Sequence, residues 1–353
     1  MPITTLRQLL DEATEKLNTT KVPDPRYDAR ALLMSAYQLS PAQYLLYEHD
    51  APEALIPRVL PDAEALSAAT TLFQANVERR RRREPLQQIL GTAGFYGLDF
   101  VVTKDVLCPR ADTETLVDAV LGNLMPEQIT SICAAPLGAV PACAQRTDVE
   151  KPTVDASATV STVDKCPDFL SHVDNEGASL LDVCTGSGCI AIALTKFGAF
   201  RDTTAVDISG AALAIARRNA DRLLITEAVD FTLLQSDMFS ALAERTEDEQ
   251  MKRYDVIVSN PPYIPSAVVD ELEPEVRDYE PRIALDGTAD GLRFYRILAA
   301  ESVHYLKPGG RIYLEIGYDQ GERVPALLEA AGFQEVTVIR DFGGNDRVVA
   351  AHL

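Results

Sequence analysis

Residues 178–196 read ASLLDVCTGSGCIAIALTK, and this stretch decides the fold class. The apolar run that ends at Val183 has the length and composition of a buried strand, and the residues from Cys189 onward have those of a helix. Between them, Gly186 and Gly188 permit a tight turn, because glycine adopts backbone conformations that other residues avoid. A strand, a glycine-rich turn and a helix in this order are typical of an open α/β sheet with parallel strands.

Strand and helix patterns continue to alternate from Ala178 to the C-terminus. The alternation predicts a doubly wound, Rossmann-like α/β domain that spans residues 178–353 and contains a seven-stranded sheet. Only residues 342–345 join the last two strands, so we expect these two to form an antiparallel hairpin. The predicted strands lie at 179–184, 203–208, 229–237, 254–259, 310–317, 333–341 and 346–353.

The chain before Ala178 divides into three parts. Residues 1–85 carry apolar side chains at helical spacing, which predicts a small all-helical domain, either a plain bundle or one that docks a substrate. Residues 86–125 contain an alternating stretch and a helical one, so we expect a connecting hairpin and a helix. Residues 126–177 are rich in Ala, Pro, Thr, Ser and Val without a sustained period, which predicts a flexible insertion.

The composition is that of a soluble globular protein, with 353 residues of which 46% are hydrophobic and 24% charged. No stretch approaches the ~18 apolar residues needed to cross a bilayer, and no signal peptide is evident, so we expect a cytoplasmic protein without a membrane partner. The net charge of −20 argues against direct nucleic-acid binding. The six cysteines form no CxxC pair and only four histidines are present, so no metal site is expected.

Residues at the ends of three predicted strands indicate a binding site for a cofactor that contains a nucleoside. The turn from Cys184 to Gly188 precedes a helix N-terminus, which favours an anion such as the carboxylate of a methionine moiety, although a plain tight turn has the same pattern. Asp207 stands where an acid accepts hydrogen bonds from ribose hydroxyls, with a helix cap as the alternative. Asp237 and Met238 follow the third strand, where they can bind the amine and the ring face of adenine or form an ordinary loop.

The most informative motif is Asn260-Pro261-Pro262-Tyr263, directly after the predicted strand 254–259. Two prolines fix the backbone and remove two N–H donors, so the turn presents the side-chain oxygen of Asn260 and the carbonyl of Pro261 as acceptors. A substrate NH2 group has two hydrogens to donate to them, and the ring of Tyr263 can lie against its flat face. A rigid strand-to-loop turn is the alternative, but the carboxyl edge of a parallel sheet is where ligands bind.

Together these patterns predict transfer of a methyl group from S-adenosylmethionine to a planar nitrogen. An amide nitrogen is a poor nucleophile because its lone pair is delocalised, and accepting both N–H bonds draws it towards tetrahedral geometry. Positioning supplies much of the remaining rate, and no general base is required. The predicted catalytic residues are Asn260, Pro261, Pro262 and Tyr263. The residues predicted to bind the cofactor are Cys184, Thr185, Gly186, Ser187, Gly188, Asp207, Asp237, Met238 and Asn260.

Several further segments, taken with these motifs, resemble one family. The matching segments are EPLQQILGTAGFYGLDF (84–100), PRADTETLV (109–117), LDVCTGSGCIAIAL (181–194), AVDIS (205–209), SDMFSAL (236–242), NPPYI (260–264) and ALDGTADGLRFYRIL (284–298). In combination they are similar to the release factor glutamine N5-methyltransferases, and the resemblance covers nearly the whole chain except 126–177.

The resemblance implies a class I methyltransferase domain that methylates the glutamine of the Gly-Gly-Gln motif in peptide chain release factors. It implies that the Asn260 motif holds the glutamine amide, that the Cys184 turn, Asp207 and Met238 hold S-adenosylmethionine, and that the N-terminal helical domain helps to dock the release factor. This chain departs from the family at Cys184, where many members have Gly, and at Met238, where some have a larger aromatic residue.

Other functions stay open at this point. They are methylation of a ribosomal-protein glutamine, adenine-N6 methylation of nucleic acid, which the net charge disfavours, and a non-catalytic adaptor role. The run Arg79–Arg83 is either a solvated helix end or a contact for an acidic partner. We also expect Arg110 and Glu114 to pair across the first turn of a helix that lines the pocket.

Overall fold

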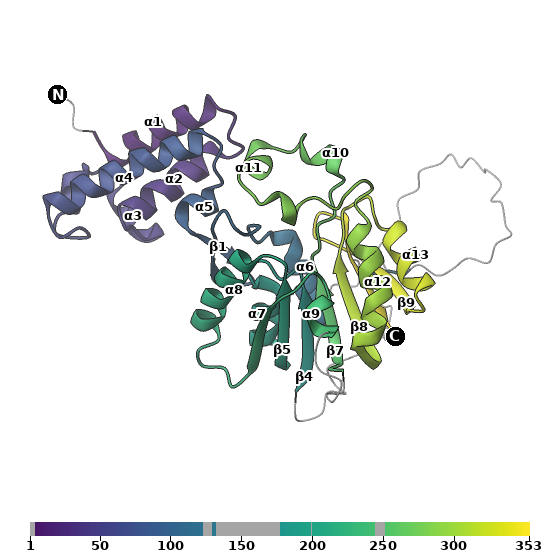
Figure 1. The fold of residues 1–353 in the computed structure, drawn as a ribbon. Helices are drawn as coiled ribbons and strands as arrows, with labels where there is room; N and C mark the ends of the chain where they lie inside the picture. Colours follow the sequence, from purple (N-terminus) through teal and green to yellow (C-terminus); the bar gives the residue numbers. More distant parts are fainter. Residues whose placement is uncertain (1–3, 123–128, 132–176, 199, 244–250) are drawn as a thin grey trace, which may run out of the picture.

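The computed structural model describes residues 4–122, 129–131, 177–198, 200–243 and 251–353. Figure 1 shows a group of N-terminal helices beside a large twisted sheet that carries helices on both faces. In the part of the chain so described, no helix is long and apolar enough to span a membrane.

The N-terminal region is a bundle of helices, as its apolar spacing predicts. Thr5 with Gln8 and Ser40 with Gln43 form capping boxes, in which each side chain binds the backbone N–H of the other and fixes the start of a helix. Buried leucines and Tyr37 make up the core of the bundle. The helices are α1 (Leu6–Asn18), α2 (Pro25–Ala36), α3 (Pro41–Tyr47), η1 (Pro52–Leu55), α4 (Ala63–Arg81) and α5 (Leu86–Leu90).

An antiparallel hairpin and a helix follow the bundle. Their elements are β1 (Thr92–Phe95), β2 (Leu98–Val101), η2 (Ala111–Thr113) and α6 (Glu114–Leu121). The side chain of Asn219 donates to the carbonyl of Val101 at 3.1 Å and accepts the N–H of Val101 at 2.7 Å. Phe95 and Phe100 are buried in the same apolar cluster as Leu180 of the large sheet. The hairpin is therefore fastened to the sheet by both polar and apolar contacts.

The large sheet contains the seven strands that the sequence predicts. They are β4 (Ala178–Val183), β5 (Phe200–Asp207), β6 (Asp230–Gln235), β7 (Tyr254–Ser259), β8 (Leu306–Glu315), β9 (Gln334–Arg340) and β10 (Asp346–His352). Their order across the sheet is β9-β10-β8-β7-β4-β5-β6. From β8 to β6 all neighbours are parallel, whereas β10 runs antiparallel to both β8 and β9. The predicted hairpin of the last two strands is confirmed.

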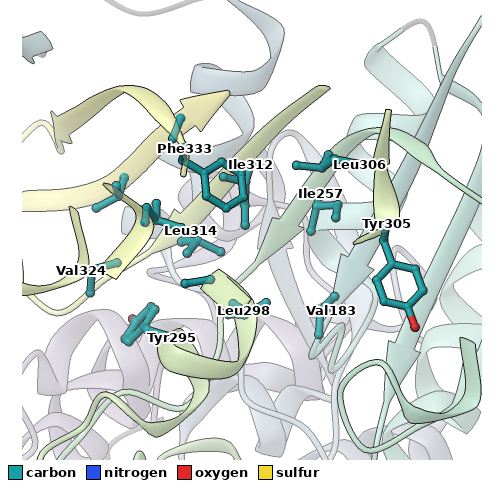
Figure 2. Close-up of a cluster of buried hydrophobic side chains, with 14 of the residues drawn as sticks. Val183, Ile257, Tyr295, Leu298, Tyr305, Leu306, Ile312, Leu314, Val324 and Phe333 are labelled. Carbon is teal, nitrogen blue, oxygen red and sulfur yellow. The ribbon is translucent and has the colours of Figure 1, made fainter. Parts of the chain in front are cut away.

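Helices bury both faces of this sheet. One face packs against α6, α7 (Cys189–Phe197) and α8 (Gly210–Leu223), and the other against α9 (Ser240–Ala243), α12 (Arg293–Tyr305) and α13 (Arg323–Ala330). The short helices α10 (Ser266–Val269), α11 (Pro274–Arg277) and η5 (Arg282–Ala284) lie in the segment between β7 and α12. Alternate residues of β7 divide between two cores, because Val256 and Val258 pack with α6 and α7 whereas Ile257 packs with α12. Figure 2 shows the second core, which includes Tyr295 of α12 and Leu314 of β8.

One strand of the sheet was not predicted. β3 (Ile129–Ser131) pairs antiparallel with β9 and adds an eighth strand at that edge. It falls within residues 126–177, for which the sequence predicts a flexible insertion without strands, so that prediction is wrong for these three residues. A strand this short is too brief for an alternating pattern to be detected. The rest of the segment, except Gly177, lies outside the described residues.

The arginine run 79–83 joins the bundle to the sheet domain. Arg80 is only 4% exposed, and its guanidinium lies 2.6 Å from Oδ2 of Asp28 and 2.9 Å from Oε1 of Glu275. Arg83 approaches the same oxygen of Glu275 at 2.5 Å. Neither of the two sequence-based interpretations describes Arg80 and Arg83, because both form ion pairs within the chain. Arg81 and Arg82 are exposed at the end of α4, as the interpretation of a solvated helix end predicts.

Candidate active site

A cavity of about 470 Å³ opens at the carboxyl ends of β4, β5 and β7. This is the edge at which open parallel sheets bind ligands, and the volume lies within the roughly 300–1,000 Å³ of typical ligand pockets. Nine of the predicted site residues line it, namely Cys184, Thr185, Gly186, Ser187, Asp207, Asp237, Met238, Asn260 and Pro262.

The turn after β4 is fixed by hydrogen bonds to the neighbouring strand. The N–H of Thr185 donates to the carbonyl of Val206 at 3.0 Å, and its hydroxyl donates to Asp182 at 2.6 Å. The N–H of Gly186 donates to Oδ2 of Asp207 at 2.8 Å. Gly186 has a φ of +56°, a conformation that favours glycine, so the sequence places glycine where the backbone requires it.

Asp207 supports this turn while it faces the cavity. Its Oδ2 accepts the N–H of Gly186 and its Oδ1 accepts the N–H of Ser209, each at 2.8 Å. Burial raises the pKa of Asp207, and these N–H bonds act in the opposite direction. The hydroxyl of Ser209 caps α8 by accepting the N–H of Ala212 at 3.1 Å, so Asp207 is not needed as the helix cap. Each carboxylate oxygen therefore retains capacity for a ligand hydroxyl.

Cys184 and Met238 form an apolar part of the cavity wall. Sγ of Cys184 lies 3.8 Å from Sδ of Met238, and Met238 is 6% exposed. Both residues have positive φ angles, +66° and +51°, which are uncommon for residues with side chains. Asp237 also lines the cavity, but it is exposed.

The residues of this cavity fit S-adenosylmethionine. The start of α7 offers backbone N–H groups to a carboxylate, Asp207 offers acceptors to ribose hydroxyls, and Met238 with Ile208 offers an apolar surface to adenine. Gly186 leaves open space at the turn, since nothing lies within 4 Å of the point where its Cβ would be. A ligand can thus approach the backbone there closely.

A second cavity, of about 440 Å³, adjoins the first. Tyr263 and the buried Glu315 line this second cavity but not the first. Asn260 therefore stands in the wall between the two cavities. The residues common to both linings are Leu107, Arg110, Asn260 and Ala284.

The acceptors predicted from the Asn260 motif are available. Nδ2 of Asn260 donates to Oγ1 of Thr113 at 3.4 Å, which turns Oδ1 away from Thr113. Within the described residues, no group donates to Oδ1 of Asn260 or to the carbonyl of Pro261. Both oxygens can therefore accept hydrogen bonds from a bound molecule.

The turn that carries this motif is held from both ends. The hydroxyl of Ser259 donates to the carbonyl of Val183 at 2.6 Å, and Nε2 of Gln320 donates to the carbonyl of Tyr263 at 3.1 Å. A Cβ at Gly287 would lie 2.8 Å from the carbonyl oxygen of Pro262, so only glycine permits this approach. The acceptors are thus presented by a rigid turn.

Two predicted site residues line neither cavity, Gly188 and Pro261. Gly188 has a φ of +80°, and a Cβ there would lie 3.1 Å from Ile192 and 3.2 Å from Ala216. Its position therefore serves the close packing of α7 on α8. Pro261 is buried behind Asn260.

Several residues of the site were missed or misassigned. Arg110 donates to both carboxylate oxygens of Glu280, at 2.9 and 2.8 Å, whereas Glu114 accepts the N–H of Tyr96 at 2.6 Å. The predicted pairing of Arg110 with Glu114 is therefore wrong, because a partner distant in the chain takes Arg110. The missed lining residues include Asp105–Cys108, Pro281–Ala284, Thr288, Arg293, Phe294 and Glu315. Among these, only Ala284, Thr288, Arg293 and Phe294 lie in a segment that resembles the family.

This fold and site define the class of the protein: it is an S-adenosylmethionine-dependent methyltransferase with a Rossmann-like domain. Two family models match the chain, "PrmC N-terminal domain" over residues 8–91 and "Ribosomal protein L11 methyltransferase (PrmA)" over residues 157–280. The particular family follows from full-length relatives, and the chain belongs to the release factor glutamine methyltransferases.

The relatives match over almost their whole length. A release factor glutamine methyltransferase of Geobacter sulfurreducens is 36% identical over 99% of this chain and 98% of its own. Those of Moorella thermoacetica and Caulobacter vibrioides are 35% and 34% identical, over 99% and 98% of this chain and 98% and 95% of theirs. The predicted fold class, enzyme class and cofactor are confirmed.

Proposed function

We propose that this chain methylates the side-chain amide nitrogen, N5, of the glutamine in the Gly-Gly-Gln motif of peptide chain release factors. The observation that carries the proposal is the place of Asn260, in the wall between a cavity that fits the cofactor and a second cavity. A glutamine side chain that enters the second cavity would bring its amide to Oδ1 of Asn260.

The Asn260 motif would act by holding the amide. Oδ1 of Asn260 and the carbonyl of Pro261 accept its two N–H groups, and the ring of Tyr263 packs against its flat face. Both acceptors are preorganised because the turn is rigid, so they stabilise the positive charge that develops on the nitrogen without first having to move. Bound S-adenosylmethionine supplies a methyl group on a positively charged sulfur. The nitrogen can lose its proton later, so the site needs no general base.

The cofactor-binding roles belong to the same proposal. The turn Cys184, Thr185, Gly186, Ser187 and Gly188 supports the carboxylate end, Asp207 the ribose, and Asp237 with Met238 the adenine. Gly188 acts by packing α7 and thereby shaping the turn.

The N-terminal bundle, residues 1–85, would dock the release factor. A protein substrate needs contact area beyond one glutamine, and the cofactor motifs all lie after Ala178. Because release factors act at ribosomes, we place the reaction in the cytoplasm, without direct binding of nucleic acid by this chain.

Labelled methyl transfer to a purified release factor tests this proposal. We expect label in the release factor and none in a matched release factor whose Gly-Gly-Gln glutamine is replaced by alanine. Ribosomal proteins and an adenine-containing oligonucleotide serve as competing acceptors. Label in either of these, with none in the release factor, would overturn the assignment.

A further inference from the structure

Glu315, the last residue of β8, is a buried acid that the mechanism above does not use. Its side chain lines the second cavity beside Asn260 and Tyr263, yet it is only 2% exposed. Within the described residues, its Oε2 has no hydrogen-bond partner. A buried carboxylate without a full set of donors costs stability, so its presence here calls for an explanation other than packing.

An ion pair does not explain this carboxylate. The cation that acts on its pKa is Arg347 of β10, whose guanidinium lies 3.0 Å from Asp341 and 3.4 Å from Asp112 and is paired with them. Arg347 contributes to the charge environment of Glu315, but no contact of 4 Å or less joins the two side chains within the described part of the chain.

The groups that act on the charge of Glu315 come from η2, β10 and the turn after β7. The pKa of Glu315 is raised to about 7, with burial as the largest cause and Asp112 acting in the same direction, while Thr113, Arg347 and Asn260 act to lower it. The other titratable groups that feel its charge are Tyr263, Tyr295 of α12 and Cys189 of α7. Thr113 and Asn260 are thus the uncharged polar side chains that favour the charged form of this carboxylate.

The orientation of the Asn260 amide depends on these neighbours. An asparagine amide can turn over, which would exchange its oxygen for its NH2 group. A carboxylate can only accept, so a carboxylate behind Asn260 favours the orientation with NH2 towards Glu315 and Thr113. Nδ2 is indeed directed at Oγ1 of Thr113, at 3.4 Å.

We propose that Glu315 is a positioning residue that holds the NH2 group of Asn260, together with Thr113, and so keeps Oδ1 of Asn260 turned towards the substrate amide. This inference rests on the proposed function, because it assigns Oδ1 the role of accepting from the substrate. Glu315 itself does not touch the cofactor or the reacting atoms.

Kinetics of Glu315→Gln test the role. The substitution keeps the size of the side chain but adds an NH2 group, which can donate to Oδ1 and permit the turned-over amide. We expect single-turnover transfer at pH 8 to fall by about tenfold or more, the scale of a hydrogen bond to a charged group, while the Kd for S-adenosylmethionine stays within about twofold. In the wild type the rate should rise between pH 6 and pH 8, and in the variant this rise should disappear.

Ser302→Ala is the matched control. Ser302 of α12 is fully buried and its Oγ has no hydrogen-bond partner in the described part of the chain, but it lines neither cavity. We expect wild-type rates and an unchanged pH profile. A Glu315→Gln enzyme with the wild-type rate and the wild-type pH profile would overturn the positioning role, as would an equal loss in Ser302→Ala.

A measurement without substrate separates this inference from the proposed function. The side-chain NH2 resonances of Asn260, assigned from their loss in Asn260→Asp, should shift as the pH passes through about 7 in the wild type and stay fixed in Glu315→Gln. Absence of the shift in the wild type refutes the contact. A shift without methyl transfer to any release factor refutes the proposed function and leaves the contact standing.

Discussion

The two cavities that meet at Asn260 differ in how their polar groups are hydrogen-bonded. In the first, the polar groups are bonded to one another, as when Asp207 accepts the N–H groups of Gly186 and Ser209. In the second, Glu280 accepts from Arg110, but Oε2 of the buried Glu315 has no donor among the described residues. The first cavity is thus formed before its ligand arrives, whereas the second presents unfilled acceptors. This difference indicates that separate substitutions can weaken cofactor binding and binding of the substrate amide.

Replacing Asn260 is the strongest way to separate the two cavities. Asn260→Ala removes an acceptor while Pro261 and Pro262 keep the turn in place. Loss of one preorganised contact of this kind costs about 10²–10³ in turnover. We expect methyl transfer to a release factor to slow at least about a hundredfold, with affinity for S-adenosylmethionine within a few-fold of wild type, measured by single turnover and calorimetry. Transfer within a few-fold of wild type by the folded variant would contradict the catalytic role.

Asp207→Ala should produce the opposite pattern. Removal of the ribose acceptor should cost roughly 1.5–3 kcal/mol of cofactor binding, which weakens the Kd by roughly 10- to 150-fold. At saturating cofactor the transfer rate should recover most of its wild-type value. Calorimetry that finds an unchanged Kd would remove the ribose assignment, and a rate that stays low at saturation would show that the two cavities are coupled.

A buried acid with a pKa raised to about 7 lies near each cavity, and the pH dependence of stability should reveal both acids. The pKa of Asp182 is raised to about 7 by burial, and so is that of Glu315. A carboxyl whose pKa is higher in the folded than in the unfolded state binds protons on folding, so it loses stability as the pH rises from about 4 to about 7. Melting temperature should therefore fall over this range in the wild type, and fall less in Asp182→Asn and in Glu315→Gln. An identical fall in all three proteins would contradict the raised pKa values.

The smallest expected effect concerns the wall of the first cavity. Cys184 has a φ of +66°, which costs a residue with a side chain about 1–2 kcal/mol. Cys184→Gly removes this strain but adds freedom to the unfolded chain, worth about 0.4–1 kcal/mol. We expect a net gain below about 1 kcal/mol in the free energy of unfolding, read from denaturant melts. Cys184→Ala keeps the strain and should show no gain, and a stabilised Cys184→Ala would refute the explanation.

The part of the first cavity at the strand ends could be predicted from the sequence, whereas its other walls and most of the second cavity could not. The first is made of residues that directly follow strands, such as Gly186 and Asp207, so short-range patterns reveal them. The second depends on contacts distant in the chain, such as Arg110 with Glu280, 170 residues apart. Glu315 lies within the predicted strand 310–317, and nothing in the alternation marks a buried acid there.

The same limit applies to the fold. The seven long strands and the helices between them were predicted because their periodicity extends over many residues. The short elements α9, α10, α11 and β3 have three or four residues each, which is too few to establish a period. Their positions are decided by tertiary contacts, such as the pairing of β3 with β9.

The buried Arg80 has a consequence for exchanging parts between relatives. It pairs with Asp28 inside the bundle and with Glu275 of the segment that leads to Pro281 and Ile283 in the cavity wall. A chimera that receives a foreign bundle without arginines that match both Arg80 and Arg83 would leave the Glu275 carboxylate uncompensated beside its own active site. We therefore expect the N-terminal helices to be interchangeable between family members only together with residues 270–280. In melting curves, a chimera that exchanges both segments should be more stable than one that exchanges the helices alone.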